Sequence, residues 1–307
     1  MFKHILIPLD GSHLAEAALP AAVYLAHQLG ARITLVHVIE RDAPLEVHGE
    51  RHLSDPDEAR KYLDEVATRA FPTGTEVEKH VHSSKVSDVA QSIAEHVGEL
   101  GTDLIVMCTH GRSGLRTWVF GRIAQQVVGL GSIPVLLVQP VESGRQPEFT
   151  CRRLLVTLDG NPDHEQGLSV AASLAKVCKA ELHMVMVVHK YENLSGEQAA
   201  TAKILPRATI ALLDLAQEEA EEYLHRYVTE LQAAGLGVMA DVYRGDPVAT
   251  IVSAAAQKDI DLIVLATHGK TGMNAFWSGS VTPNVTSRTF VPLLLVPVHR
   301  KETDSCN

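Results

Sequence analysis

Two short segments of the sequence contain residues that could hold a phosphate group. The segment VLATHGKTGM at 264–273 is repeated almost letter for letter by VMCTHGRSGL at 106–115, which lies 158 residues earlier. A P-loop is excluded, because the glycine that it needs five residues before its last one is replaced here by Val264. Glycines that follow a strand nevertheless let backbone amides approach a phosphate closely.

A helix start completes this feature in the later segment. The strand predicted at 261–267 leads into His268 and Gly269, and after nine further residues Gly279 and Ser280 open the next predicted helix. Unpaired amides at a helix N-terminus attract anions, and the hydroxyl of Ser280 adds a hydrogen bond. The alternative is a plain strand-to-helix turn, in which His268 bonds only its own loop.

An aspartate ends the first predicted strand in each half of the chain. Asp10 lies in PLDGS, and Asp159 lies in TLDGN, where it is followed by Gly160. A carboxylate at this edge of a parallel sheet can accept a hydrogen bond from the sugar or base of a nucleotide. The alternative role is an Asx-type turn with the following glycine. Two strand ends directed at one site favour a ligand.

Internal repeats explain why these features occur twice. HILIPLDGS matches RLLVTLDGN and ARITLVHV matches AELHMVMV at an offset of 149, whereas DLIVMCTHG matches DLIVLATHG and IPVLLV matches VPLLLV at 158. The second copy is therefore nine residues longer, and the extra length lies between about 188 and 243. We predict a first domain at 1–140, a linker at 141–152, a second domain at 153–300 and a tail at 301–307.

Each copy alternates short runs of Val, Ile and Leu with helical patterns, which predicts βαβ units and a parallel sheet with helices on both faces. In the first copy the predicted strands lie at 3–9, 31–38, 75–82, 103–108 and 134–138. A helix follows Ser12, its predicted N-cap, and ends at Gly30, and Pro20 is expected to kink it. In the second copy we predict a long helix whose final part is residues 215–235. The acidic run in this part indicates a solvated face.

Composition and charge exclude several classes of function. The chain has 307 residues, of which 46% are hydrophobic, enough for two cores. Its 27 Lys and Arg against 37 Asp and Glu give a net charge of −10 without a basic run, so nucleic acid is not an expected partner. No apolar run suits a signal peptide or a membrane span, and the four cysteines are scattered, so we expect a cytoplasmic protein without a membrane partner.

Other catalytic and metal motifs are weak. Neither GxSxG nor GxGxxG occurs, and no carboxylate pair is placed for acid and base catalysis, so we predict no catalytic residue. His80 with His82 and His48 with His52 are the only close histidine pairs. Because no cysteine or second pair lies at zinc spacing, no metal site is predicted. His80 and His82 are expected on one face of a strand, partly solvated.

Together these segments resemble a tandem universal stress protein over nearly the whole chain. The resemblance rests on ILIPLDGS, ARITLVHV, DLIVMCTHGRSGL, VFG and PVLLV and on their counterparts in the second half. It implies two flavodoxin-like, Rossmann-like α/β domains, each with a five-stranded parallel sheet. It also implies a stress-response sensor or regulator rather than a dedicated enzyme. Many members of the family bind ATP through a Gly-x2-Gly-x9-Gly-Ser/Thr pattern.

The two copies match this pattern unequally. The second copy replaces only the first glycine, and the pattern falls on Ala266, Gly269, Gly279 and Ser280. The first copy loses the first glycine and the terminal hydroxyl, and the pattern falls on Cys108, Gly111, Gly121 and Arg122. Nucleotide is therefore expected mainly in the second domain.

The resemblance also implies roles for the residues around each pattern. Asp159 would take the adenosine end and Val187 the base, and the phosphates would bind at Gly269, Gly279, Ser280 and Val281. The counterparts in the first copy are Asp10, Val38, Gly111, Gly121 and Ile123. Arg122 there either pairs with a phosphate or fills the pocket with its bulk. The expected ligand is ATP, ADP or AMP, with Mg²⁺ as a companion of the nucleotide.

In the resembled family the last strands pair between subunits. PVLLV and PLLLV are apolar, and apolar strands at a sheet edge favour association. We therefore expect these strands to pair within the chain as a pseudodimer of the two halves, and further homodimerisation is left open. Two alternatives to a nucleotide sensor are an interaction module with empty pockets and a slow ATPase.

Overall fold

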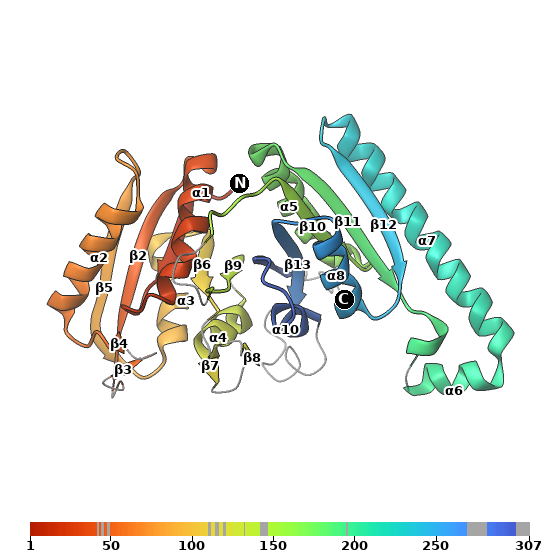
Figure 1. Cartoon of the computed structure of the whole chain (residues 1–307), viewed down its shortest axis with the longest axis horizontal. Coiled ribbons are helices and arrows are strands. Elements are labelled where there is room, and N and C mark those ends of the chain that lie inside the picture. Colours follow the sequence, from red (N-terminus) through yellow and green to blue (C-terminus); the bar gives the residue numbers. More distant parts are fainter. Residues whose placement is uncertain are drawn as a thin grey trace, which may run out of the picture. The chain divides into compact units, whose positions relative to one another are not determined.

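The structure is a computed structural model, and it describes the chain except residues 42, 44–45, 48–49, 110–111, 114–116, 119–120, 132, 142–146, 195, 269–280 and 299–307. The described residues pack as two compact units (Figure 1). Unit 1 lies within Met1–Thr150 and Thr267–His299, and unit 2 lies within Cys151–Ala266. The predicted tail at 301–307 and much of the predicted linker fall outside the described residues.

Unit 1 is built on a sheet in the order β5-β2-β1-β6-β9-β14. These strands are β1 (His4–Pro8), β2 (Arg32–Glu40), β5 (Val77–Val86), β6 (Leu104–Cys108), β9 (Val135–Val138) and β14 (Leu293–Val298). The neighbouring strands are parallel except β9 and β14, which are antiparallel. All five strands predicted for the first repeat are confirmed. In chain order they are arranged 3-2-1-4-5, so the strand order reverses between β1 and β6.

Helices cover the sheet of unit 1. They are η1 (Ala15–Ala18), α1 (Leu19–Leu29), α2 (Pro56–Ala70), α3 (Val89–Leu100), α4 (Arg122–Leu130) and α10 (Val281–Thr286). Two short antiparallel pairs are also present, formed by β3 (Glu46–Val47) with β4 (Glu50–Arg51) and by β7 (Arg112–Ser113) with β8 (Thr117–Trp118). The inner strands are almost fully buried, because helices hide both faces of a parallel sheet.

The first helix begins differently from the sequence prediction. Ser12 is not the N-cap that the sequence predicts, because Leu14 precedes the 3-10 turn and Ala18 is the N-cap of α1. The Oγ of Ser12 accepts a hydrogen bond from the amide of Ala15 at 3.2 Å. Residues Ala15–Ala18 form a 3-10 turn, and α1 starts only at Leu19. Pro20 lies in the first turn of α1, where no amide donor is needed from proline, so the predicted kink inside the helix is wrong. Gly30 ends α1 in the left-handed region at a φ of 62°, as predicted.

The closing strands of the two repeats pair within unit 1. Leu294 of β14 lies opposite Leu136 of β9 in the antiparallel register. Gln139, which is buried, donates from Nε2 to the carbonyl oxygen of Thr286 and, at 2.7 Å, to that of Thr289. The strand pairing that the sequence predicts is therefore present, and it holds the end of the second repeat on the first unit.

Unit 2 has a parallel sheet in the order β12-β11-β10-β13, which is the same 3-2-1-4 arrangement. Its strands are β10 (Arg153–Leu158), β11 (Glu181–Val188), β12 (Val238–Arg244) and β13 (Leu262–His268). Its helices are η2 (Pro162–His164), α5 (Glu165–Cys178), η3 (Tyr191–Asn193), α6 (Gly196–Ile204), α7 (Pro206–Ala233) and α8 (Pro247–Gln257). The mixed α/β class of the chain is thus confirmed.

The extra length of the second repeat contains η3 and α6 and leads into α7. The acidic run of α7 is solvated as predicted, because Glu218, Glu219, Glu221 and Glu222 are all exposed. Within the described part of the chain, every helix is either too short or too polar to traverse a lipid bilayer.

Candidate functional site

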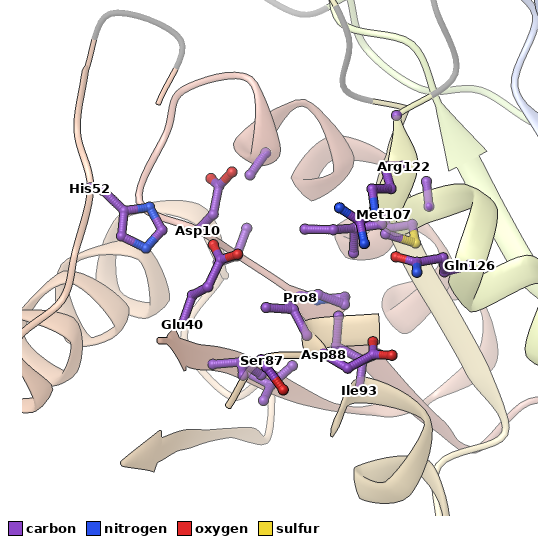
Figure 2. Close-up of a pocket in the computed structure, with 18 residues that line it drawn as sticks. Pro8, Asp10, Glu40, His52, Ser87, Asp88, Ile93, Met107, Arg122 and Gln126 are labelled. Carbon is purple, nitrogen blue, oxygen red and sulfur yellow. The ribbon is translucent and has the colours of Figure 1, made fainter. Parts of the chain in front are cut away.

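A cavity of about 440 Å³ opens at the carboxyl ends of β1, β2 and β6 in unit 1 (Figure 2). This volume lies within the range of about 300–1,000 Å³ that is usual for small-molecule sites. Apolar side chains make up much of its lining and include Val36, Val38, Ile93 and Met107. The cavity lies where the strand order reverses, which is the usual ligand position in open α/β sheets.

The N-terminus of α4 forms one side of the cavity. Gly121 is its N-cap, with a φ of −62° and a ψ of 145°, and as a glycine it has no side chain to cap the helix. The first hydrogen bond within the helix runs from the amide of Gln125 to the carbonyl oxygen of Gly121. The backbone amides that come before Gln125 in the first turn therefore have no acceptor within the helix. Arg122 and Ile123 line the cavity at this point. The helix end and the guanidinium together favour an anionic group.

Carboxylates lie on the other sides of the cavity. Figure 2 shows Asp10 and Glu40 near His52, and Arg122 with Gln126 across from them. Oδ1 of Asp10 accepts hydrogen bonds from the amide and the hydroxyl of Ser12 at 2.9 and 2.7 Å, which is the Asx-type turn that the sequence allowed as its second role. A carboxylate offers about four acceptor positions, so this turn is compatible with a further bond to a ligand.

His52 is a buried polar residue whose ring lines the same cavity. Its side chain is only 8% exposed, and neither ring nitrogen has a hydrogen-bond partner among the residues that the structure describes. Burial, assisted by the nearby ring of His37, lowers the pKa of His52, so the ring is neutral at pH 7. A neutral imidazole offers one donor and one acceptor. A polar ligand in the cavity would satisfy these atoms, whose burial is otherwise costly.

Acidification is expected to destabilise unit 1 through His52. Its pKa in the folded state is below the ordinary 6.5, so the unfolded chain binds the proton more readily once the pH falls through 6.5. The free energy of unfolding should therefore decrease as the pH falls below about 6.5, and less steeply in His52→Gln. Urea unfolding at several pH values measures this slope. The exposed His27→Gln is the control and should keep the full slope, whereas an unchanged slope in His52→Gln would contradict the assignment.

In unit 2 the counterpart residues lie at the corresponding strand ends. Oδ1 of Asp159 accepts from the amide of Asn161 at 3.0 Å, and its Oδ2 lies 2.6 Å from Nδ1 of His164. Gly160 has a φ of 78°, which favours glycine, and Val187 is partly exposed near the end of β11. Asp159 therefore forms the Asx-type turn and also pairs with a histidine.

The alanine that replaces the first glycine of the binding pattern is accommodated in unit 2. Ala266 lies on β13 against α5, at the point where α5 carries Gly167. A Cβ atom placed on Gly167 would lie 3.4 Å from Cβ of Ala266. The helix thus approaches the strand closely here because one of the two facing residues is a glycine.

Comparison with known proteins identifies the family. The model described as "Universal stress protein family" matches residues 1–139 and again residues 150–297. The chain belongs to the universal stress protein family.

Curated relatives match about half of this universal stress protein. Universal stress protein YxiE of Bacillus subtilis is 30% identical over 152 residues, covering 45% of this chain and all of the relative. A universal stress protein of Methanocaldococcus jannaschii is 26% identical over 158 residues, covering 52% of this chain and 89% of the relative. Each of these relatives therefore corresponds in length to about one repeat.

Solved structures match nearly the whole chain. A universal stress protein of Archaeoglobus fulgidus has a TM-score of 0.70 at 18% identity and covers 97% of each chain. A protein of Pseudomonas aeruginosa described as functionally unknown has a TM-score of 0.68 at 16% identity and covers 97% of this chain and 93% of its own. At these identities the structures support the fold alone.

As far as the structure describes the chain, the cavity of unit 1 in this universal stress protein is lined by site residues predicted for the first repeat and not by those predicted for the second. Asp10, Val38, Gly121, Arg122 and Ile123 all line it. Several residues predicted for the phosphates lie outside the described residues, namely Gly111, Gly269, Gly279 and Ser280, as does the side chain of His268. Val281 begins α10 and is partly exposed. The expected preference for the second repeat stays a prediction.

Sequence reasoning missed several polar residues of the cavity. Glu40 ends β2, and Ser87 and Asp88 follow β5, but both strands run past their predicted ends at 38 and 82, so the strand-end rule applied to Asp10 did not reach these residues. His52 was considered only as a metal ligand with His48, which lies outside the described residues. No local pattern marks His52, because the fold alone brings it over the end of β2.

Proposed function

We propose that this universal stress protein binds an adenine nucleotide and acts as a cytoplasmic sensor or regulator in a stress response. The observation that carries the proposal is the cavity of about 440 Å³ at the reversal of strand order, with a helix N-terminus capped by a glycine on one side. Its apolar lining suits a planar base, and its carboxylates suit sugar hydroxyls. The choice of adenine follows from the family resemblance.

The charges around the cavity favour a ligand with few phosphates in the first repeat. Asp10, Glu40 and Asp88 are acidic, whereas Arg122 is the one lysine or arginine among the lining residues that the structure describes. A triphosphate would bring several negative charges close to these carboxylates, and like charges repel strongly where water is partly excluded. We therefore propose a nucleoside or a nucleoside monophosphate for this cavity.

The second repeat is proposed as the site for a triphosphate. Gly269, Gly279 and Ser280 keep three of the four positions of the family pattern, and a hydroxyl at the helix start can bond a phosphate oxygen. Mg²⁺ would accompany the polyphosphate there, since this ion is commonly held through substrate phosphates.

Replacement of Arg122 by alanine is expected to weaken AMP binding about tenfold or more and to leave adenosine binding within about twofold, because charge-assisted hydrogen bonds contribute about 1.5–3 kcal/mol. Isothermal titration of the full chain with AMP and with adenosine measures both affinities. Arg60→Ala, on the exposed surface of α2, is the matched control. An equal effect on the two ligands would show that Arg122 does not contact the phosphate.

The proposed function is tested by two measurements on the purified full chain. Mass spectrometry of small molecules released on denaturation identifies any ligand that is retained, and titration with ATP, ADP and AMP gives their affinities. The absence of both retained and titratable nucleotide would overturn the proposal and favour an interaction module. Phosphate release that scales with protein concentration and disappears in Ser280→Ala would instead indicate a slow ATPase.

We also propose that the two repeats form a pseudodimer. The antiparallel pairing of β9 with β14 joins the closing strands of the repeats and supports this arrangement. Such pairing also removes an apolar sheet edge that would favour uncontrolled association.

A further inference from the structure

Three histidines from two separate segments meet in unit 1. His80 and His82 lie two residues apart on β5, and His96 lies on α3. One ligand atom from each ring lies within 4.8 Å of the others. The Nε2 atoms of His80 and His96 are 2.8 Å apart, and the ring of His82 lies 5.0 Å from that of His96 between centroids. Alternate residues of a strand share a face, so β5 presents both of its rings to the helix.

The surroundings of His96 set its tautomer. Its side chain is buried, and its Nδ1 lies 2.6 Å from the carbonyl oxygen of Ser92, one turn earlier. A carbonyl oxygen only accepts hydrogen bonds, so Nδ1 carries the proton and Nε2 presents a lone pair to His80. Histidines that bind metals commonly donate their other ring N–H to a backbone carbonyl in this way. His96 is therefore held in the form that a metal ligand needs.

We propose that His80, His82 and His96 form a binding site for a divalent transition-metal ion, for which Zn²⁺ is the natural probe. Imidazole nitrogens suit such ions, whereas Mg²⁺ and Ca²⁺ prefer oxygen ligands. Zinc–nitrogen bonds of about 2.0–2.1 Å separate tetrahedral ligands by about 3.3 Å. The nitrogens of His80 and His96 therefore need to move apart by about 0.5 Å, which the partly exposed ring of His80 allows.

The side chain of Glu99 lies close enough to the three rings to supply a fourth ligand. Oε2 of Glu99 lies 4.0 Å from Nε2 of His96, and its side chain is 67% exposed, so a small rotation brings the carboxylate to the ion. Water can take this position instead, as in zinc sites with three protein ligands. The partial exposure of His80 and His82 gives an ion access from solvent.

A hydrogen bond between two neutral rings is the competing explanation. Burial and the neighbouring rings of His96 and His82 lower the pKa of His80, so its uncharged form is stable here. Strand geometry places His82 on the same face as His80, but the bond between His80 and His96 does not use the ring of His82, which also lies within the same 4.8 Å. The second repeat has no histidine in β12 or α8, the counterparts of β5 and α3. The cluster is therefore not part of the repeated scaffold.

Equilibrium dialysis of the full chain against Zn²⁺, followed by elemental analysis, tests the site. We expect one tightly bound Zn²⁺ that competing Mg²⁺ does not displace. In His80→Gln/His82→Gln the affinity for Zn²⁺ should fall by about a hundredfold or more. His27→Gln/His225→Gln changes two exposed histidines and is the matched control, in which binding should be unchanged. Equal Zn²⁺ affinity in the wild type and in His80→Gln/His82→Gln would overturn the proposal.

Cobalt provides a second readout that is independent of the fold of the variants. Co²⁺ bound to the wild type should show the visible absorption of a tetrahedral site with nitrogen ligands, and Zn²⁺ should bleach it. A strong thiolate charge-transfer band would place the ion on cysteine and overturn the proposal. His96→Gln, with circular dichroism to confirm folding, should lose the visible absorption, and its retention would exclude His96 as a ligand and with it the three-histidine site.

Discussion

Leu136→Ala is expected to lower the free energy of unfolding of unit 1 by about 2–5 kcal/mol. Leu136 is 0% exposed at the centre of β9. It lies between Val106 of β6 and Leu294 of β14 in the sheet. Truncation loses the transfer free energy of the buried methyl groups and leaves a cavity that two neighbouring strands hold open. The loss should therefore be near the upper part of the range.

Urea unfolding followed by circular dichroism measures this change. Leu212→Ala is the matched control, because the same atoms are removed from a side chain of α7 that is 66% exposed. The control should alter the free energy of unfolding by no more than about 0.5 kcal/mol. If the two variants unfold alike, Leu136 is not packed between β6 and β14, and the pairing of the closing strands fails with it.

Gly279→Val is expected to weaken ATP binding about a hundredfold, which corresponds to about 2.7 kcal/mol. The family pattern puts Gly279 at a helix start that binds phosphates, where a branched side chain would keep the backbone amides away from the ligand. Gly121→Val should leave ATP binding within about threefold, because we propose that the carboxylates of the first-repeat cavity disfavour a triphosphate.

Gly121→Val should act on a different ligand. Gly121 lines the cavity, and its φ of −62° and ψ of 145° suit an L-residue, so valine adds bulk without backbone strain. We expect a loss of AMP binding of about tenfold or more. Calorimetric titration of both variants with ATP and with AMP separates the effects. An equal loss of ATP binding in the two variants would refute the asymmetry between the repeats.

The fold was largely predictable from local patterns. The strands of the first repeat were found because buried parallel strands are nearly continuous apolar runs, as in Ile5–Ile7. Gly30 was assigned correctly because a helix C-cap depends on residues a few positions apart, whereas Ser12 was wrongly assigned as the N-cap because a 3-10 turn precedes α1. Pro20 was misjudged because its effect depends on where the helix begins, and a 3-10 turn delayed that start to Leu19.

The candidate site was predictable only in part. Asp10 and Gly121 could be placed at one edge of a sheet, since a parallel sheet aligns the ends of its strands. The positions of Asp10 and Gly121 did not show that two acidic residues, Glu40 and Asp88, and the basic Arg122 would line the same cavity. That balance is a property of several segments together, and the preference proposed for a monophosphate depends on it.

The sequence by itself determined the repeats, the family and the strand-end residues, because backbone preferences and burial patterns act over a few neighbouring positions. The meeting of His96 with His80 and His82, the burial of His52 in the cavity and the pairing of β14 with β9 come from packing. These contacts join residues from 14 to more than 150 positions apart, as for His82 with His96 and Leu136 with Leu294. No local preference acts over such separations, so the three-dimensional fold alone creates them.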